Sequence, residues 1–103
     1  MSNKLEEDFC INIKGVSASK VNGNEYVILR NTNSYDVNAE YRVFGLRYDG
    51  RKPDLLANGI AALGLSGSAS STKDISVGHD TTPGFNDTYY TVVVDIIHVV
   101  KSA

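Results

Sequence analysis

Residues suited to catalysis are few and widely spaced in this sequence. Nucleophilic catalysis needs a Ser, Cys or Thr beside a base, and the available histidines are His79 and His98. His98 stands in the apolar segment 96–100, which is typical of a core or interface histidine. His79 precedes Asp80 on an expected loop, where a histidine is normally an exposed side chain. We therefore predict a protein that is not an enzyme and has no catalytic residue.

The residue types that hold metals and cofactors are also too sparse. Zinc takes three or four Cys or His ligands, and Cys10 is the single cysteine. We expect Cys10 to be a small apolar residue of the first strand, with a bridge between identical subunits as the alternative. The segments 22–24 and 31–33 contain Asn but lack the carboxylates of a calcium loop, and no glycine-rich phosphate loop is present. The prediction is no metal and no cofactor.

Acidic residues offer one further chemistry, that of a carboxylate pair for glycoside hydrolysis. Asp49, Asp54, Asp80 and Asp87 are available for such a pair. Any small domain has this many acids, so the feature is weak support for a hydrolase. A hydrolase that uses His79 with an acid is the least favoured of the functions considered.

The length and charge of the chain limit the kinds of partner that it is expected to bind. Its 103 residues fit one domain, with residues 1–7 as a polar N-terminal arm. Ten basic residues oppose twelve acidic ones, with no basic stripe, which argues against nucleic acid and against membrane insertion. The first eight residues lack the apolar segment of a secretory signal, so we expect cytoplasmic synthesis, with incorporation into a virion or extracellular assembly left open.

Short segments of β-branched and aromatic residues at period two predict an all-β protein. The first strand is expected over 8–14, and the turn 22–24 should join a hairpin whose second arm is 25–30, followed by a polar loop over 31–34. Alternation from Val37 to Val43 changes phase at Gly45, which predicts a β-bulge or a strand that crosses between sheets.

The middle of the chain has mixed signals. Pro53 followed by Asp54 to Ala57 predicts one helical turn that ends at Asn58-Gly59. A short buried strand is expected over 60–65, an exposed loop or weak edge strand over 66–72, and a strand over 73–77 with Ile75 and Val77 inward. A long loop should then cover 78–88.

The last strand, over 89–101, is apolar on both faces. One face presents residues 89, 91, 93, 95, 97 and 99, and the other presents 90, 92, 94, 96, 98 and 100. A strand that is apolar on both sides has to be covered on both, either as a central strand or at a subunit interface.

The run Phe44-Gly45-Leu46-Arg47-Tyr48-Asp49-Gly50 resembles the immunoglobulin-like domains of bacterial surface proteins that are named for a Phe-x-Leu-Tyr-Asp signature. This chain has one extra residue between Leu46 and Tyr48, and Ser66-Gly67 replaces the Pro-Gly of those domains. The resemblance covers about half the chain and implies a β-sandwich used for display, adhesion or assembly.

Together these features predict an antiparallel β-sandwich of about seven or eight strands, immunoglobulin-like or jelly-roll in topology. The expected function is a self-associating structural subunit of a virion, appendage or other surface assembly. The alternative is a monomeric module that binds protein or glycan through tyrosine-bearing loops, and the small-molecule ligand is unknown. The candidate interface and binding residues are Tyr35, Tyr48, Tyr90, Val92, Val94, Ile96 and His98.

Overall fold

The computed structural model describes residues 11–21, 26–77 and 84–102. The predicted N-terminal arm, Cys10, the turn 22–24, His79 and Asp80 lie outside the described residues. The elements in chain order are β1 (Ile11–Ile13), β2 (Val16–Val21), β3 (Tyr26–Asn31), β4 (Val37–Arg47), β5 (Asp54–Leu63), β6 (Thr72–Ser76), α1 (Phe85–Thr88) and β7 (Tyr89–Lys101). The prediction of an all-β protein is confirmed.

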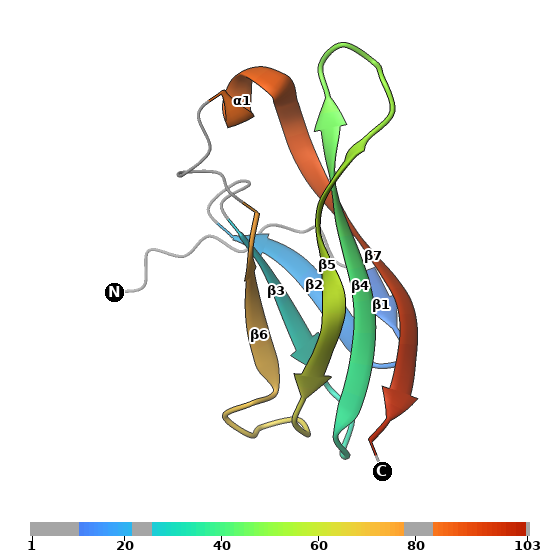
Figure 1. The fold of residues 1–103 in the computed structure, drawn as a ribbon. Coiled ribbons are helices and arrows are strands. Elements are labelled where there is room, and N and C mark those ends of the chain that lie inside the picture. The colour runs from blue at the N-terminus through green and yellow to red at the C-terminus, as the bar shows by residue number, and fades with distance from the viewer. Residues whose placement is uncertain (1–10, 22–25, 78–83, 103) are drawn as a thin grey trace, which may run out of the picture.

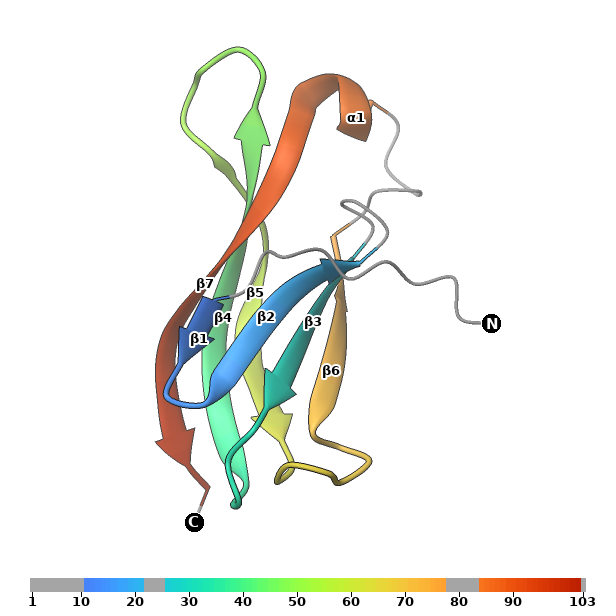
Figure 2. The same ribbon diagram turned by 180° about the vertical axis from the view of Figure 1, so that it is seen from behind.

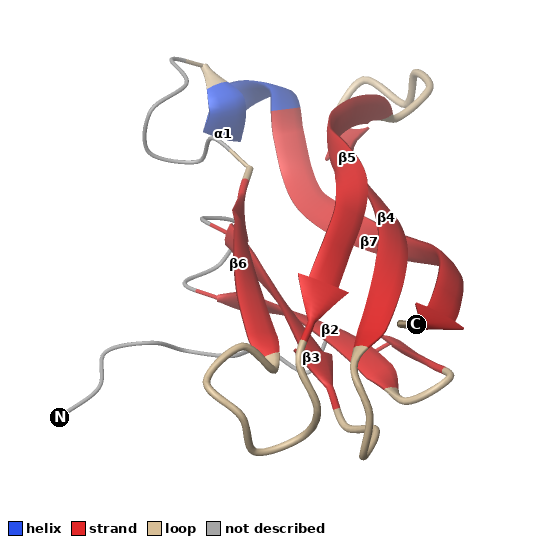
Figure 3. Ribbon diagram, turned by 60° about the horizontal axis from the view of Figure 1, so that its bottom comes forward, coloured by secondary structure: helices blue, strands red, loops and turns tan. Residues whose placement is uncertain are grey.

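The strands form two antiparallel sheets that lie one behind the other (Figures 1 and 2). Sheet A has the order β1-β2-β3-β6, and sheet B has the order β5-β4-β7. Figure 3 shows β6, β3 and β2 on one side of the molecule and β5, β4 and β7 on the other. The chain passes between the sheets in the 31–37 and 63–72 connections.

The core lies between the inner faces of the two sheets and is made of alternate residues along each strand, as the period of a strand requires. Burial is complete or nearly so at the central positions. Sheet A contributes Val16, Ala18, Val27, Leu29, Ile75 and Val77, and sheet B contributes Val37, Ala39, Tyr41, Val43, Ala61, Leu63, Val92, Val94, Ile96 and Val99. The inward positions predicted for Ile75 and Val77 are confirmed.

A two-residue turn joins β1 to β2. Lys14 and Gly15 have φ angles of 49° and 82°, and Ile13 pairs with Val16 across the turn. Positive φ at both central positions is the geometry of a type I′ turn, whose twist matches that of the flanking strands. Strands β1 and β2 therefore form a hairpin with Gly15 in its turn.

Asn31, at the end of β3, holds the loops at this end of the sheets. Its side chain is 1% exposed. The Nδ2 group donates to the carbonyl oxygens of Tyr35 and Gly64, at 2.9 and 3.0 Å. The Oδ1 atom accepts from the backbone N and the Nδ2 of Asn33, at 2.9 and 3.0 Å. The polar loop predicted over 31–34 begins at residue 32, after the end of β3, and Asn31 satisfies its backbone.

The segment predicted to form a helical turn, 53–58, is extended instead. It belongs to β5, whose residues from Asp54 onward pair with β4. Local Pro and Gly signals favoured one turn of helix, but such a turn is short, and pairing with the long neighbouring strand supplies more backbone hydrogen bonds. The helix among the described residues is the single turn α1, in the region predicted as a loop.

Strand β4 stays in sheet B along its whole length, so it does not cross between sheets at Gly45. Phe44 and Leu46 lie on the outer face, and Gly45 remains buried on the inner face. A register irregularity does occur beside it, between Val43 and Phe44 in the ladder with β5. The change in sequence phase therefore reflects an outer face that becomes apolar.

Strand β7 is extended, as predicted, and lies at the edge of sheet B in the described structure. Within the chain it is thus not the central strand that its two apolar faces suggested. None of the helices in the part of the chain that the structure describes has the length and apolar character needed to cross a membrane.

Candidate interaction surface

Tyr48 and Tyr90 contact each other at the end of sheet B where the hairpin between β4 and β5 lies, which we call the hairpin end. Their ring centroids are 5.6 Å apart and the rings are tilted by 58°. Tyr48 is 66% exposed and Tyr90 is 52% exposed. Tyr90 has no partner in the ladder with β4, because Thr91 pairs with Leu46 and Tyr89 with Arg47. The pair offers an apolar aromatic surface with polar hydroxyl tips, which suits contact with another molecule.

Apolar side chains continue from this pair along the outer face of sheet B. Phe44 is directly opposite Leu55 of β5 and Val93 of β7. Leu55 is 51% exposed, and Phe44 and Val93 are half-buried. Together these side chains form what we call the apolar patch, made of Phe44, Leu46, Tyr48, Leu55, Tyr90 and Val93. A contiguous apolar surface of this kind marks an interaction site more often than scattered residues do.

The other half of the outer face mixes charged and polar side chains with exposed apolar ones such as Ile60. Arg42 is opposite Asn58 of β5 and Asp95 of β7. Glu40 is opposite Ile60 and His98 in the next row. The outer face thus changes from apolar at the hairpin end to mixed charged, polar and apolar toward the C-terminus.

A network around Arg47 holds the hairpin that carries Tyr48. Arg47 Nη1 lies 2.8 Å from Asp54 Oδ2, and Nη2 lies 2.9 Å from Asp49 Oδ2. Arg47 Nε also donates to Asp49 Oδ1 at 3.0 Å, so the guanidinium binds Asp49 in a bidentate manner. The Tyr89 hydroxyl donates to Asp54 Oδ2 at 2.6 Å. The two ends of the hairpin are therefore tied to each other and to β7.

These contacts shift the ionisation of the network. The Tyr89 hydroxyl, with Arg47 second, lowers the pKa of the Asp54 carboxyl below its ordinary value. The Arg47 guanidinium lowers the pKa of Asp49. The hydrogen bond to Asp54 raises the pKa of the Tyr89 hydroxyl, and the two aspartates raise that of Arg47. Lowered pKa values are the opposite of what a general acid in glycoside hydrolysis needs. Asp49 and Asp54 both form ion pairs with Arg47.

The lowered pKa of Asp54 predicts a pH dependence of stability. A carboxyl whose pKa is lower in the folded state contributes stability above its ordinary value of 3.8, and this contribution is lost as the pH falls through the folded value. We expect Asp54→Asn to flatten the acid side of the profile of melting temperature against pH. Asp74→Asn, at an exposed position of β6, is the matched control. Parallel acid limbs for wild type and Asp54→Asn would show that the network does not couple to folding.

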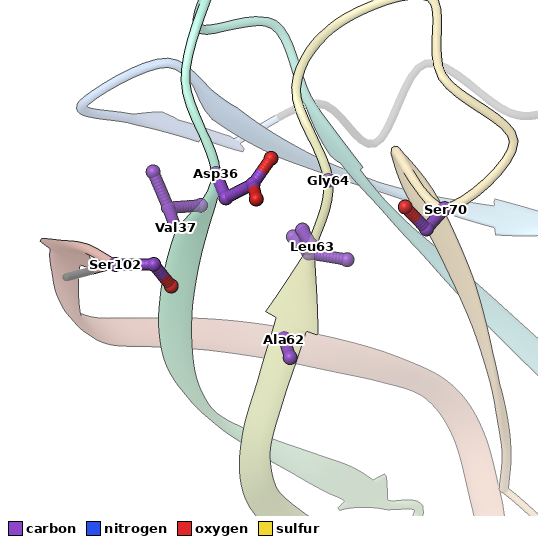
Figure 4. A pocket seen from close by; sticks show the side chains of 7 residues that line it. All are labelled: Asp36, Val37, Ala62, Leu63, Gly64, Ser70 and Ser102. Atoms are coloured by element: carbon purple, nitrogen blue, oxygen red, sulfur yellow. The ribbon is translucent and has the colours of Figure 1, made fainter.

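A shallow pocket of about 260 Å³ lies at the opposite end of sheet B (Figure 4). The Asp36 carboxylate accepts from the Leu65 backbone N at 3.0 Å, and the Ser102 backbone N donates to the Asp36 carbonyl at 2.9 Å. Among the described residues that line it there is no histidine, cysteine or lysine to activate the hydroxyls of Ser70 and Ser102. The two hydrogen bonds of Asp36 join Ser102 to the neighbouring loops. The described lining residues are Asp36, Val37, Ala62, Leu63, Gly64, Ser70 and Ser102.

The structure separates the predicted site residues into an exposed group and a buried group. The exposed residues Tyr48, Tyr90 and His98 lie on sheet B or its hairpin. Tyr35 is also exposed but lies on the loop at the other end, with Lys101 Nζ 4.9 Å from its ring centroid. The remaining three, Val92, Val94 and Ile96, are buried in the core and cannot form a surface in the folded chain.

A bulge in β7 explains why the sequence pattern grouped three core residues with the exposed His98. His98 pairs with Glu40 and Ile96 pairs with Tyr41, which leaves Ile97 unpaired. The extra residue shifts the alternation, so Val99 follows Ile96 on the inner face. A strict period of two had grouped the core residues Val92, Val94 and Ile96 with the surface residue His98.

Other surface residues were missed by the sequence reasoning. Phe44 and Leu46 gave a signal, the phase change at Gly45, but it was assigned to a β-bulge or a strand crossing. Leu55 was assigned to a helical turn. Arg47 gave no sequence signal of its own, because its partners depend on how the hairpin folds.

In the described ranges, no cluster of three or more His, Cys, Asp or Glu side chains is arranged to hold a metal ion. No protein-family model, curated protein or solved structure matches this chain. The outer face of sheet B is the candidate interaction surface.

Proposed function

We propose that this chain is a non-enzymatic structural subunit that self-associates through sheet B, as a component of a virion, appendage or surface assembly. The observation that carries the proposal is the outer side of β7. Ile97 and Val100 of β7 are 40% and 43% exposed, and Tyr90 and Val93 add apolar side chains toward the hairpin, with the exposed Asp95 and His98 between them. Covering this side with a second copy removes apolar area from water, which stabilises the contact by about 25 cal/mol per Å².

The proposal includes a β-sandwich of immunoglobulin-like rather than jelly-roll topology. The order β2-β3-β6 in one sheet and β7-β4-β5 in the other is consistent with strands A-B-E and F-C-C′ of immunoglobulin-like domains. The core shared by the two inner faces supports the same interpretation.

Self-association predicts a molar mass that rises with protein concentration. In size-exclusion chromatography with light scattering, we expect values above the 11.2 kDa of a single chain as the concentration reaches the high micromolar range. A mass that stays at that of one chain at the highest concentration would refute the proposal.

A monomeric recognition module is the second candidate, and the Tyr48–Tyr90 pair within the apolar patch favours it. Such a module would bind a protein or glycan through the hairpin end of sheet B. Such a module stays monomeric at all concentrations, and its Tyr48 becomes protected from chemical modification when the ligand is added. In a self-associating subunit, any loss of Tyr48 reactivity follows the protein concentration instead.

A further inference from the structure

We infer that two copies of this chain pair antiparallel along the outer edge of β7, with Asp95 of each copy opposite His98 of the other. The pairing joins the two copies of sheet B into one continuous sheet. This inference rests on the proposed self-association and specifies its geometry.

Among the described strands, only β4 pairs with β7 along residues 93–100. Strand β4 occupies one edge of β7, and none of the described strands forms a ladder with the other. Strand β1 contacts β7 from sheet A without pairing to it. Nearer the hairpin, Lys20 Nζ donates to Thr91 Oγ1 at 2.7 Å and links β7 to β2, so we place the pairing on the C-terminal side of that contact. Backbone N–H and C=O groups on a strand edge favour pairing with another strand.

The bulge at Ile97 gives β7 its charge pattern. Asp95 and His98 are three residues apart and would point to opposite faces of a regular strand. Because Ile97 is extra, Asp95 pairs with Arg42 and His98 with Glu40, two residues apart on the regular strand β4. Both side chains are exposed and lie on the outer face of sheet B.

The register with Asp95 opposite His98 matches the faces of two such strands. Antiparallel pairing of Asp95 with His98 of the second copy also places Val93 opposite Val100 and Val94 opposite Val99. Val93 and Val100 are outer residues, while Val94 and Val99 are inner residues. Directly opposite residues share a face in an antiparallel pair, so the register keeps outer with outer and inner with inner. The bulges of the two copies meet at the twofold axis.

Charge complementarity selects the same register and identifies the second copy as the occupant. Across the joined sheet, one row reads Arg42, Asp95, then His98 and Glu40 of the second copy, so a carboxylate alternates with a basic side chain at each step. His98 donates an N–H to the carboxylate in either protonation state. A register centred on Asp95 would oppose two carboxylates, and one centred on Val94 would set Asp95 against Val93. Opposite charges in cross-strand pairs stabilise a sheet and like charges destabilise it.

Disulfide trapping tests the register directly. In a Cys10→Ser background, Val93→Cys and Val100→Cys chains are prepared separately, one of them with an affinity tag, and oxidised alone and as a mixture. We expect a crosslinked dimer from the mixture and little from either chain alone, because position 93 of one copy is opposite position 100 of the other and neither position is opposite itself. Crosslinking of either chain alone to the same extent, or none in the mixture, would overturn the inferred register.

A charge exchange tests the contact without a crosslink. His98→Glu sets a second carboxylate against that of Asp95 at both symmetry-related contacts beside the twofold axis, and we expect the dimer dissociation constant to rise about tenfold or more. The double variant Asp95→Lys with His98→Glu restores opposite charges and should recover the dimer. Asn58→Glu adds the same charge to the outer face on β5, away from the β7 edge, and should leave the dimer dissociation constant unchanged.

The outcomes separate this inference from the proposed function. A wild-type protein that stays monomeric refutes both. A dimer that resists His98→Glu but is weakened by Leu55→Glu or Asn58→Glu keeps the self-association and overturns the edge pairing in favour of contact through the outer face. Melting curves of each variant separate loss of pairing from loss of folding, and the disulfide experiment decides if His98→Glu fails to fold.

Discussion

Replacing Asn31 by aspartate is expected to lower the free energy of unfolding by about 3 kcal/mol. The Nδ2 group is the donor to the carbonyl oxygens of Tyr35 and Gly64, and the side chain is 1% exposed. A carboxylate at this position would set negative charge against two carbonyl oxygens at a site that water does not reach. The substitution keeps the size of the side chain, so packing changes little.

Urea denaturation of Asn31→Asp and Asn31→Ala measures this effect. The alanine variant leaves both carbonyl oxygens without their donor but adds no charge, so we expect a smaller loss of about 2 kcal/mol. Asn58→Asp makes the same chemical change on an exposed position of β5 and should stay within about 0.5 kcal/mol of wild type. If Asn31→Asp and Asn58→Asp behaved alike, Asn31 would not be the residue that holds these loops.

The strands of this chain follow from local sequence where one face is apolar and the other polar. Period-two alternation correctly placed the inward residues Ile75 and Val77, and the Asn-rich segment 31–34 was correctly predicted as a loop that its own side chains stabilise. These features depend on residues close in sequence, which is why sequence reasoning finds them.

Tertiary pairing determined the features that the sequence did not indicate. Asp54 and Leu55 carry the signals of a helical turn, yet pairing with β4 makes them strand. The bulge at Ile97 depends on the ladder with β4 and has no glycine to mark it, so the inner and outer residues of β7 could not be assigned from its own sequence.

The candidate surface shows the same division. Tyr48 and Tyr90 were both named from the sequence as candidate interface or binding residues, but their contact joins residues far apart in the sequence. The apolar patch needs the registers of β4 with β5 and of β4 with β7 together, because Phe44 connects Leu55 to Val93. Residue types therefore indicated interaction, whereas register determined which residues act together.

Gly45 is the residue whose replacement should most directly test how the hairpin end is built. A Cβ atom at this position would lie 2.6 Å from Tyr89 Cδ1 and 2.8 Å from Tyr89 Cε1. The φ angle of Gly45 is not among the positive values found at other glycines, so the backbone itself accepts alanine. Glycine is needed at position 45 because the Tyr89 ring occupies the space of a side chain.

Gly45→Ala is accordingly expected to destabilise the protein by about 2 kcal/mol, since the Tyr89 ring has to move away and its hydroxyl leaves Asp54. In a Tyr89→Ala background the same substitution should cost less than about 0.5 kcal/mol, because the obstacle is gone and alanine suits a strand better than glycine. Urea denaturation of the four proteins in this double-mutant cycle measures the coupling. Additive effects would mean that the Tyr89 ring is not what requires glycine, and attention would shift to Leu56 Cδ1, which lies 3.0 Å from the same Cβ position.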